Sequence, residues 1–125
     1  MDEIVIAMRN HDFEKNDVIA LNHDNEIYIK RVIATGGDMV DINGDGVVSV
    51  NGTILDEPYI SELSLGNCSI VFPFQVPPET IFVLGDNRAS SLDSRDTRFG
   101  TVDRGQVIGK VKFGIWPFSQ LGNIS

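Results

Sequence analysis

One lysine stands in an unusual place for a charged side chain. Lys30 lies inside the stretch EIYIKRVIATGGD, between Ile29 and the apolar pair Val32 and Ile33. Burial among apolar neighbours disfavours the ammonium form and lowers the pKa of a lysine. A lysine that is neutral near physiological pH can act as a general base. The alternative is an exposed lysine whose stem packs on the strand while its amine stays in water.

A second group of residues suited to chemistry directly follows an apolar strand. The segment GDNRASSLDSR is dense in aspartate, arginine and serine. Its carboxylates and guanidiniums, on Asp86, Arg88, Asp93 and Arg95, can pair as bidentate forks. Such a network would hold the loop rigid beside the strand and so support an active site. The alternative is a solvated loop built from Asx and serine turns.

Other reactive residue types indicate no further site. His11 and His23 lie in polar segments, and a metal site needs about three or four ligands together, so neither a metal nor a cofactor is predicted. Cys68 is the single cysteine and cannot form an internal disulfide. It is expected to be an ordinary thiol.

Short β-strands separated by turn residues must position the lysine and the loop. Asn-Gly and Asp-Gly steps within 43–46 and at 51–52 predict tight hairpin turns. Prolines argue against long helices within 56–80, and a short helical turn is conceivable at 90–97. The expected strands are 3–8, 18–21, 27–34, 39–42, 47–50, 53–55, 80–86 and 107–116, with the best further candidate within 67–76. The pattern predicts a mainly β fold of antiparallel hairpins, in a single domain over 1–125.

Composition excludes several classes of partner. The chain has 125 residues and a net charge of −8, which argues against nucleic acid because its backbone attracts basic surfaces. No run approaches the roughly 20 apolar residues of a membrane span, and no signal peptide opens the chain. The chain as given is therefore expected to be soluble.

Four segments occur in this order along the chain: YIKRVIATGGD, VNGTILDEPYI, VPPETIFVLGDNRASSLDSR and GKVKFGIWP. Together they resemble the type I bacterial signal peptidases, particularly the Gram-positive form. The similarity runs from about residue 3 to about residue 118. It implies a signal-peptidase-like β fold and the removal of signal peptides from exported preproteins. The family uses a serine–lysine dyad, a variant of triad logic that needs no histidine.

The resemblance also implies roles for individual residues. Lys30 matches the general base that activates a serine, and Ser91 matches the residue that helps to orient its amine. The remaining matches are catalytic support by Asp86, Arg88, Asp93 and Arg95, and substrate binding by Tyr28 and Ile29.

The chain departs from the family pattern at three points. No serine precedes Ser49, although the family nucleophile lies upstream of the strand expected at 3–8. The membrane anchor that precedes this nucleophile is absent as well. Gly36 stands where relatives usually carry proline. Four residues separate Arg95 from Gly100 where many relatives have two, so Asp96-Thr97-Arg98 competes with the preferred Asp93-Ser94-Arg95.

These departures predict a truncated chain that holds the base and its support without the nucleophile. The parent is expected to be anchored in the cell membrane with this domain on the outer face. Two alternatives stay open: an inactive signal-peptidase-like binding protein or chaperone for exported proteins such as pilins, and a different Ser–Lys enzyme such as a self-cleaving repressor. The intact Lys30, Ser91 and Asp93 argue against the first, and the GDNRASSLDSR segment argues against the second.

Overall fold

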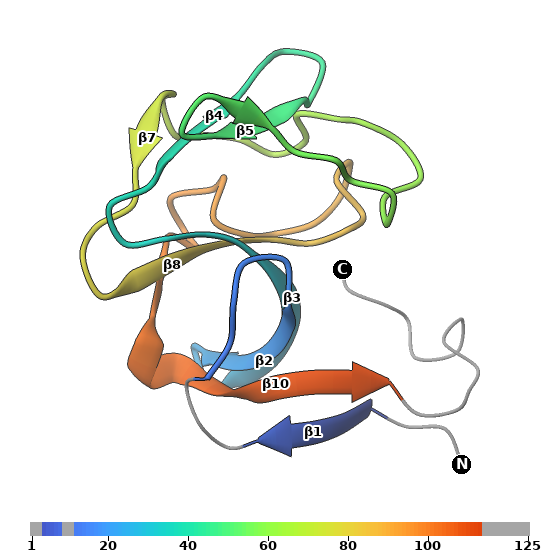
Figure 1. The fold of residues 1–125 in the computed structure, drawn as a ribbon, viewed down its shortest axis with the longest axis vertical. Helices are drawn as coiled ribbons and strands as arrows, with labels where there is room; N and C mark the ends of the chain where they lie inside the picture. Colours follow the sequence, from blue (N-terminus) through green and yellow to red (C-terminus); the bar gives the residue numbers. More distant parts are fainter. Residues whose placement is uncertain (1–3, 9–11, 114–125) are drawn as a thin grey trace.

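The computed structural model describes residues 4–8 and 12–113 (Figure 1). Within these residues the chain forms short strands and one 3-10 turn, which confirms the mainly β fold. Their bounds are β1 (Ile4–Met8), β2 (Val18–His23), β3 (Glu26–Thr35), β4 (Met39–Ile42), β5 (Val48–Val50), β6 (Thr53–Ile54), β7 (Phe74–Gln75), β8 (Thr80–Leu84), β9 (Val102–Asp103), η1 (Arg104–Gln106) and β10 (Val107–Phe113).

Two antiparallel sheets make up the fold. The larger has six strands in the order β1-β10-β2-β3-β8-β9, and the smaller has four in the order β6-β5-β4-β7. Figure 1 shows the smaller sheet at one end of the molecule and β1, β2 and β10 at the other, with β8 between them. The loop that follows β8, drawn in orange, therefore lies at the junction of the two sheets.

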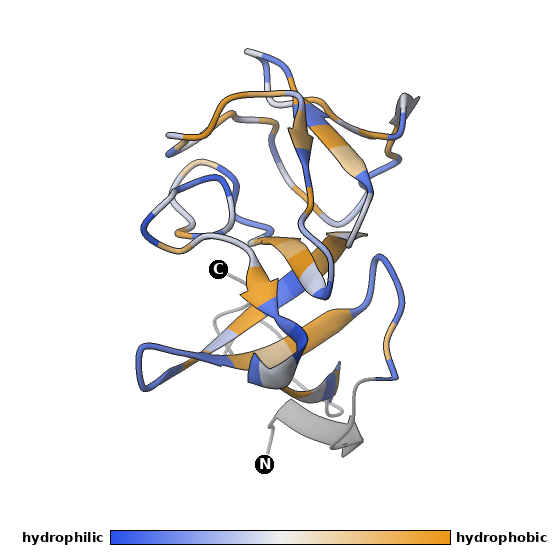
Figure 2. Ribbon diagram, turned by 90° about the vertical axis from the view of Figure 1, so that its left-hand side faces the viewer, coloured by the Kyte–Doolittle hydropathy of each residue, from blue (hydrophilic) through white to orange (hydrophobic). Residues whose placement is uncertain are grey.

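Strand β8 is apolar along its length because both of its faces are covered. Phe82 and Leu84 pack with residues of the smaller sheet in one hydrophobic cluster. Ile81 and Val83 alternate with them and pack with Ile19 and other residues of the larger sheet in a second cluster. Figure 2 shows this pattern as apolar strands joined by mainly hydrophilic loops. A continuous apolar run is what a strand buried on both faces requires.

Strand β3 changes its pairing halfway along. It pairs with β2 from Glu26 to Arg31, and with β8 from Arg31 to Thr35. Ile33 is an extra residue in the second pairing, because Val32 faces Val83 while Ala34 faces Phe82. Such a bulge re-aims neighbouring side chains and often lies near active sites.

Most of the expected strands are present, with differences where local signals were weak. The strand at 39–42 has the expected bounds, whereas the candidate within 67–76 is reduced to Phe74–Gln75. The segment 90–97 forms hydrogen-bonded turns and no helix, and the short strand Val102–Asp103 was not expected. Expected strand residues at position 3 and at 114–116 lie outside the described residues. None of the described residues belongs to a helix that is long and apolar enough to cross a membrane.

Candidate active site

Lys30 lies in the middle of β3 and points into the protein. Strand alternation places it on the same face as Tyr28 and Val32, which belong to the second hydrophobic cluster or pack against it. Only 2% of its surface is exposed. Its ammonium nitrogen lies 5.7 Å from the ring centre of Tyr28 and 5.9 Å from that of Phe99. The structure therefore excludes the alternative in which this lysine is solvated.

Burial changes the acidity of this amine. Desolvation lowers the pKa of Lys30 from 10.5 to about 8, although the negative charges of Asp93 and Asp86 act in the opposite direction. About a tenth of the Lys30 amine is therefore neutral at pH 7, and about half at pH 8. The Lys30 Nζ donates a hydrogen bond of 2.9 Å to the Ser91 Oγ, and both residues are buried. The two residues matched to base and orienting hydroxyl thus lie in contact, although 61 positions separate them.

The loop after β8 is fastened back onto that strand by its own side chains. The Ser94 Oγ accepts a hydrogen bond from the Val83 N–H at 2.9 Å and donates one to the Gly100 carbonyl at 2.8 Å. The Asp93 carboxylate accepts a bond of 2.9 Å from the Gly85 N–H. Side-chain bonds of this kind close loops that have no regular ladder. They fix the path of the backbone that carries Ser91.

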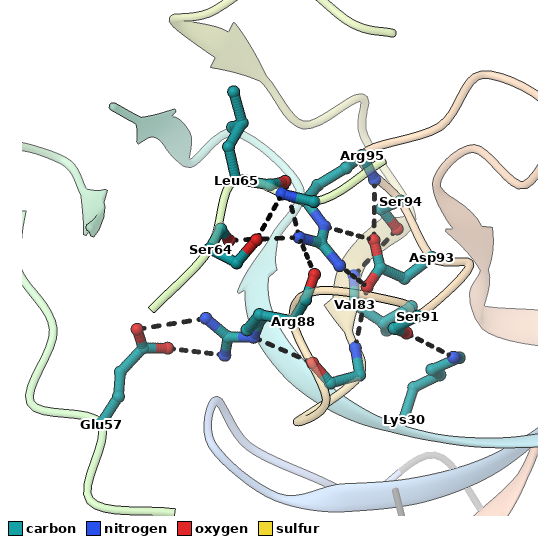
Figure 3. A network of polar contacts seen from close by, with 12 residues as sticks. Lys30, Glu57, Ser64, Leu65, Val83, Arg88, Ser91, Asp93, Ser94 and Arg95 are labelled. Carbon is teal, nitrogen blue, oxygen red and sulfur yellow. Dashed lines mark hydrogen bonds and ion pairs between the residues drawn. The ribbon is translucent and has the colours of Figure 1, made fainter. Parts of the chain in front are cut away.

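Asp93 and Arg95 form a buried bidentate ion pair. The Arg95 Nε and Nη2 each donate a bond of 2.8 Å to the Asp93 carboxylate, and both side chains are at most 1% exposed. The third guanidinium nitrogen donates to the carbonyls of Leu65 and Arg88 at 2.7 and 2.8 Å. Figure 3 shows this guanidinium between the loop and the segment that holds Leu65. The competing Asp96–Arg98 pair is peripheral, since the Arg98 side chain is 77% exposed.

Asp86 and Arg88 also form forks, with partners outside their loop. Asp86 accepts bonds of 3.0 and 2.8 Å from Arg31, the neighbour of Lys30 in β3. Arg88 donates bonds of 3.2 and 2.7 Å to Glu57 and a bond of 2.9 Å to the Gly85 carbonyl. Of the four residues expected to pair within this loop, Asp93 and Arg95 pair with each other, whereas Asp86 and Arg88 pair with Arg31 and Glu57.

Sequence reasoning missed Glu57 and Tyr59. Both lie in the connection that follows β6, and the Tyr59 hydroxyl donates a bond of 3.0 Å to Glu57. The Tyr59 ring lies 3.8 Å from the Arg31 guanidinium carbon. The only signal was their place in the segment VNGTILDEPYI, where a loop proline separates an acid from an aromatic residue.

The two residues matched to substrate binding point to different faces of β3. Tyr28 contacts the Lys30 environment and packs edge-on against Phe99 at a ring distance of 5.3 Å. Ile29 packs instead with a third cluster that contains Val18 and Val111. The backbone of β3 here has one open edge, because no described strand pairs with Glu26–Lys30 on the side away from β2.

The described part of the chain contains no cluster of side chains suited to binding a metal ion. No group of three or more histidine, cysteine, aspartate or glutamate side chains converges there. The described residues around Lys30 bring together an amine, a hydroxyl and three carboxylate–guanidinium pairs.

Comparison with known proteins relates this geometry to a family. The family described as signal peptidase, peptidase S26, matches residues 2–116. Signal peptidase I of Bacillus caldolyticus is 42% identical over 116 residues, which cover 83% of this chain and 62% of that protein. Signal peptidase IB of Staphylococcus aureus is 37% identical over 133 residues, covering 93% of this chain and 68% of that protein.

A solved structure agrees with these sequence relatives. The crystal structure of a signal peptidase I from Enterococcus faecalis V583 superposes with a TM-score of 0.66 at 28% identity, covering 81% of this chain and 97% of that one. The chain spans less than two thirds of the length of the Bacillus caldolyticus relative, at 62%. On the match over residues 2–116, the chain belongs to the signal peptidase family, peptidase S26.

Proposed function

We propose that this chain is the base-carrying part of a serine endopeptidase that removes signal peptides from exported proteins by a Ser–Lys dyad. The observation that carries the proposal is the buried Lys30 amine, which lies 2.9 Å from the Ser91 hydroxyl. Burial lowers the pKa of this amine to about 8. Burial costs free energy when it desolvates a cation. A general base is a function that repays this cost, because the neutral amine is the reactive form.

In the proposed reaction, neutral Lys30 takes the proton of a serine hydroxyl. The serine oxygen bonds to the scissile carbonyl carbon and forms a tetrahedral intermediate. The Lys30 ammonium then gives its proton to the leaving amine as the peptide carbon–nitrogen bond breaks. Water hydrolyses the resulting ester with the same amine as base. Asp93 and Arg95 keep Ser91 in place, and Ser91 in turn orients the amine.

The nucleophile is proposed to come from residues upstream of the sequence given, as the family pattern places it before β1. The first serine of this chain is Ser49. The length of the Bacillus caldolyticus relative, of which this chain covers 62%, leaves room for such a segment and for a membrane anchor. In that arrangement the full protein is held in the cell membrane with this region on the outer face.

The open edge of β3 is proposed to receive the signal peptide as an added strand. An extended peptide can bond to an exposed sheet edge through its main chain, while pockets select alternate side chains. Tyr28 borders the space beside the Lys30 amine, so it limits the side chain at the cleavage site to a small one. Ile29 contributes through its backbone at this edge, because its side chain packs on the opposite face.

A cleavage assay with the full-length gene product tests the proposal. The substrate is a peptide with small residues at the two selected positions before the scissile bond. Lys30→Ala is expected to lower kcat/KM at least about 100-fold, the usual scale of a general-base contribution. Lys112→Ala is the matched control, because it removes an exposed lysine from β10.

The pH profile gives a second criterion. The rate is expected to rise with pH through a midpoint near 8, where Lys30 loses its proton. Cleavage that persists at the wild-type rate in a folded Lys30→Ala protein contradicts the dyad. A full-length protein that binds signal peptides without ever cleaving them would instead be a binding protein.

A further inference from the structure

The segment Glu57-Pro58-Tyr59 joins two arginines that flank the Lys30–Ser91 contact. Glu57 accepts both ends of the Arg88 guanidinium at 3.2 and 2.7 Å. The Tyr59 hydroxyl bonds to the same carboxylate at 3.0 Å, and the Tyr59 ring lies 3.8 Å from the Arg31 guanidinium carbon. One short segment of the connection after β6 therefore touches both arginines.

Each arginine is close in sequence to one member of the Lys30–Ser91 contact. Arg31 follows Lys30 in β3, and its guanidinium is held between Asp86 and Tyr59. Arg88 opens the turn that leads to Ser91, whose N–H donates to the Asn87 carbonyl at 3.0 Å. A shift of either guanidinium thus moves the backbone next to the amine or the backbone next to the hydroxyl.

A contribution to stability does not by itself explain the buried Arg88–Glu57 ion pair. The Arg88 and Glu57 side chains are 1% and 5% exposed, so both ions are taken out of water. Buried ion pairs often contribute no more stability than apolar residues of the same volume. A well-formed pair of this kind does fix geometry, because its hydrogen bonds have narrow distance and angle requirements.

We propose that Glu57 and Tyr59 are positioning residues that set the Lys30–Ser91 contact, Glu57 through Arg88 and Tyr59 through Glu57 and Arg31. The inference rests on the proposed function for its kinetic consequence. Misplacement of a catalytic group by about 1 Å can cost on the order of 100-fold in rate. The segment therefore acts on the rate of proton transfer and leaves substrate binding to β3.

The charged groups around Lys30 define what a titration would report. Asp93, Arg95 and Asp86 act on the amine through their charges, and Tyr28 and Ser91 contact it. Tyr59→Phe changes none of these charges and keeps the ring against Arg31. A shift in the Lys30 titration in this variant therefore reports a change of position or of water access.

The test compares Tyr59→Phe and Glu57→Gln with Glu62→Gln in the full-length protein. Glu62 is an exposed acid of the same connection after β6, and no hydrogen bond or ion pair joins it to another described residue. Glu57→Gln is expected to lower kcat about 10-fold or more with KM within about twofold. Tyr59→Phe should lower kcat about threefold, and Glu62→Gln should match the wild type.

Carbon-13 NMR of labelled lysine adds a readout that a purely structural role would not move. The Lys30 midpoint in Tyr59→Phe should rise toward 10.5 by at least about 0.3 units, a twofold change in the protonation equilibrium. Wild-type kcat and midpoint in folded Tyr59→Phe and Glu57→Gln would overturn the inference. So would a loss of kcat without a shift in the midpoint of Tyr59→Phe.

The two proposals fail in different ways. If Glu57→Gln does not fold, Tyr59→Phe decides the inference by itself. If the wild-type protein never cleaves, the proposed function fails, and the Lys30 midpoint of Tyr59→Phe still tests the positioning role in the unreactive protein.

Discussion

Two aspartate–arginine ion pairs lie three residues apart in the loop after β8. Asp93 and Arg95 form the first, and their side chains are 0% and 1% exposed. Asp96 and Arg98 form the second with equally short bonds, as close as 2.6 Å, yet the Arg98 side chain is 77% exposed. The two pairs share their residue types and their spacing in sequence and differ in what surrounds them.

The difference arises from acceptors that other segments supply. Arg95 has three further acceptors, the carbonyls of Ser64, Leu65 and Arg88, so its charge is satisfied without water. Arg98 bonds to Asp96 and otherwise faces solvent. Identical local chemistry thus becomes an interior scaffold in one place and a surface feature in the other.

The largest expected difference between the two pairs is the loss of stability when the carboxylate of each is removed. Asp93→Ala is expected to lower the free energy of unfolding by about 3–5 kcal/mol, because it leaves the Arg95 charge buried and unpaired. Asp96→Ala should have a much smaller effect, since water replaces the lost partner. Urea denaturation of both variants measures the contrast, and similar losses would refute it.

Stability should also depend on pH differently in the two environments. Lys30, beside the buried pair, has a pKa of about 8 when folded against 10.5 in its unperturbed state. The unfolded chain therefore binds more protons between these values, and the free energy of unfolding rises with pH across this window by about 3 kcal/mol. The difference between wild type and Lys30→Met, followed by urea denaturation, isolates this contribution.

The Asp96–Arg98 pair, whose arginine is exposed, acts at the opposite end of the pH scale. Hydrogen bonds from Arg98 lower the pKa of Asp96 from 3.8 to about 2. Its stabilisation is present above pH 3.8 and is lost as the pH falls toward 2. Arg98→Ala should reduce this acid contribution, because the Arg98 backbone N–H still bonds to Asp96, and should leave the alkaline rise intact. Loss of the alkaline rise in Arg98→Ala would contradict the assignment to Lys30.

Two glycine substitutions test how tightly the buried Asp93–Arg95 pair is enclosed. Gly66 has a φ of +64°, and an added Cβ would collide with the Arg88 carbonyl and the Arg95 guanidinium. Gly52 has a φ of +85° and open space around it. Both alanine variants carry the backbone strain, but only Gly66→Ala also displaces atoms around the buried pair. Gly66→Ala should therefore lower the free energy of unfolding by about 1–3 kcal/mol more than Gly52→Ala does, which the midpoints of thermal unfolding measure. Equal effects of the two variants would show that the atoms around Arg95 are loosely packed.

The strands could be predicted because their signals are local. The alternation of MVDI, the Asn-Gly turn that joins β4 to β5 and the Asn-Gly turn that ends β5 specify these two strands without reference to the rest of the chain. The burial of Lys30 was one of two open alternatives, since strand alternation does not say which face of the strand the rest of the protein covers. The tertiary contact with Phe99 settles it, and that contact is not visible in the local sequence.

The partners of the charged residues could not be predicted because they depend on long-range packing. Asp86 pairs with Arg31 across 55 positions, and Arg88 pairs with Glu57 across 31. A carboxylate beside three loop arginines has several conceivable partners. The pairing of β3 with β8 brings Asp86 next to Arg31, and the packing of the connection after β6 brings Glu57 to Arg88. The same holds for the choice between Asp93 and Asp96, which resemble each other in sequence and differ in three dimensions.

The guanidinium of Arg95 binds the carbonyl of Leu65 as well as its own loop, and this has a consequence for cooperativity. The segment around Leu65 cannot detach without leaving a buried cation short of acceptors, so it should open together with the loop that holds Asp93. The amide protons of Gly85 and Val83, which are bonded to Asp93 and Ser94, should then exchange with solvent in the same opening event as the segment around Leu65. In the language of hydrogen exchange, the loop after β8 and the connection from the smaller sheet form one cooperative unit.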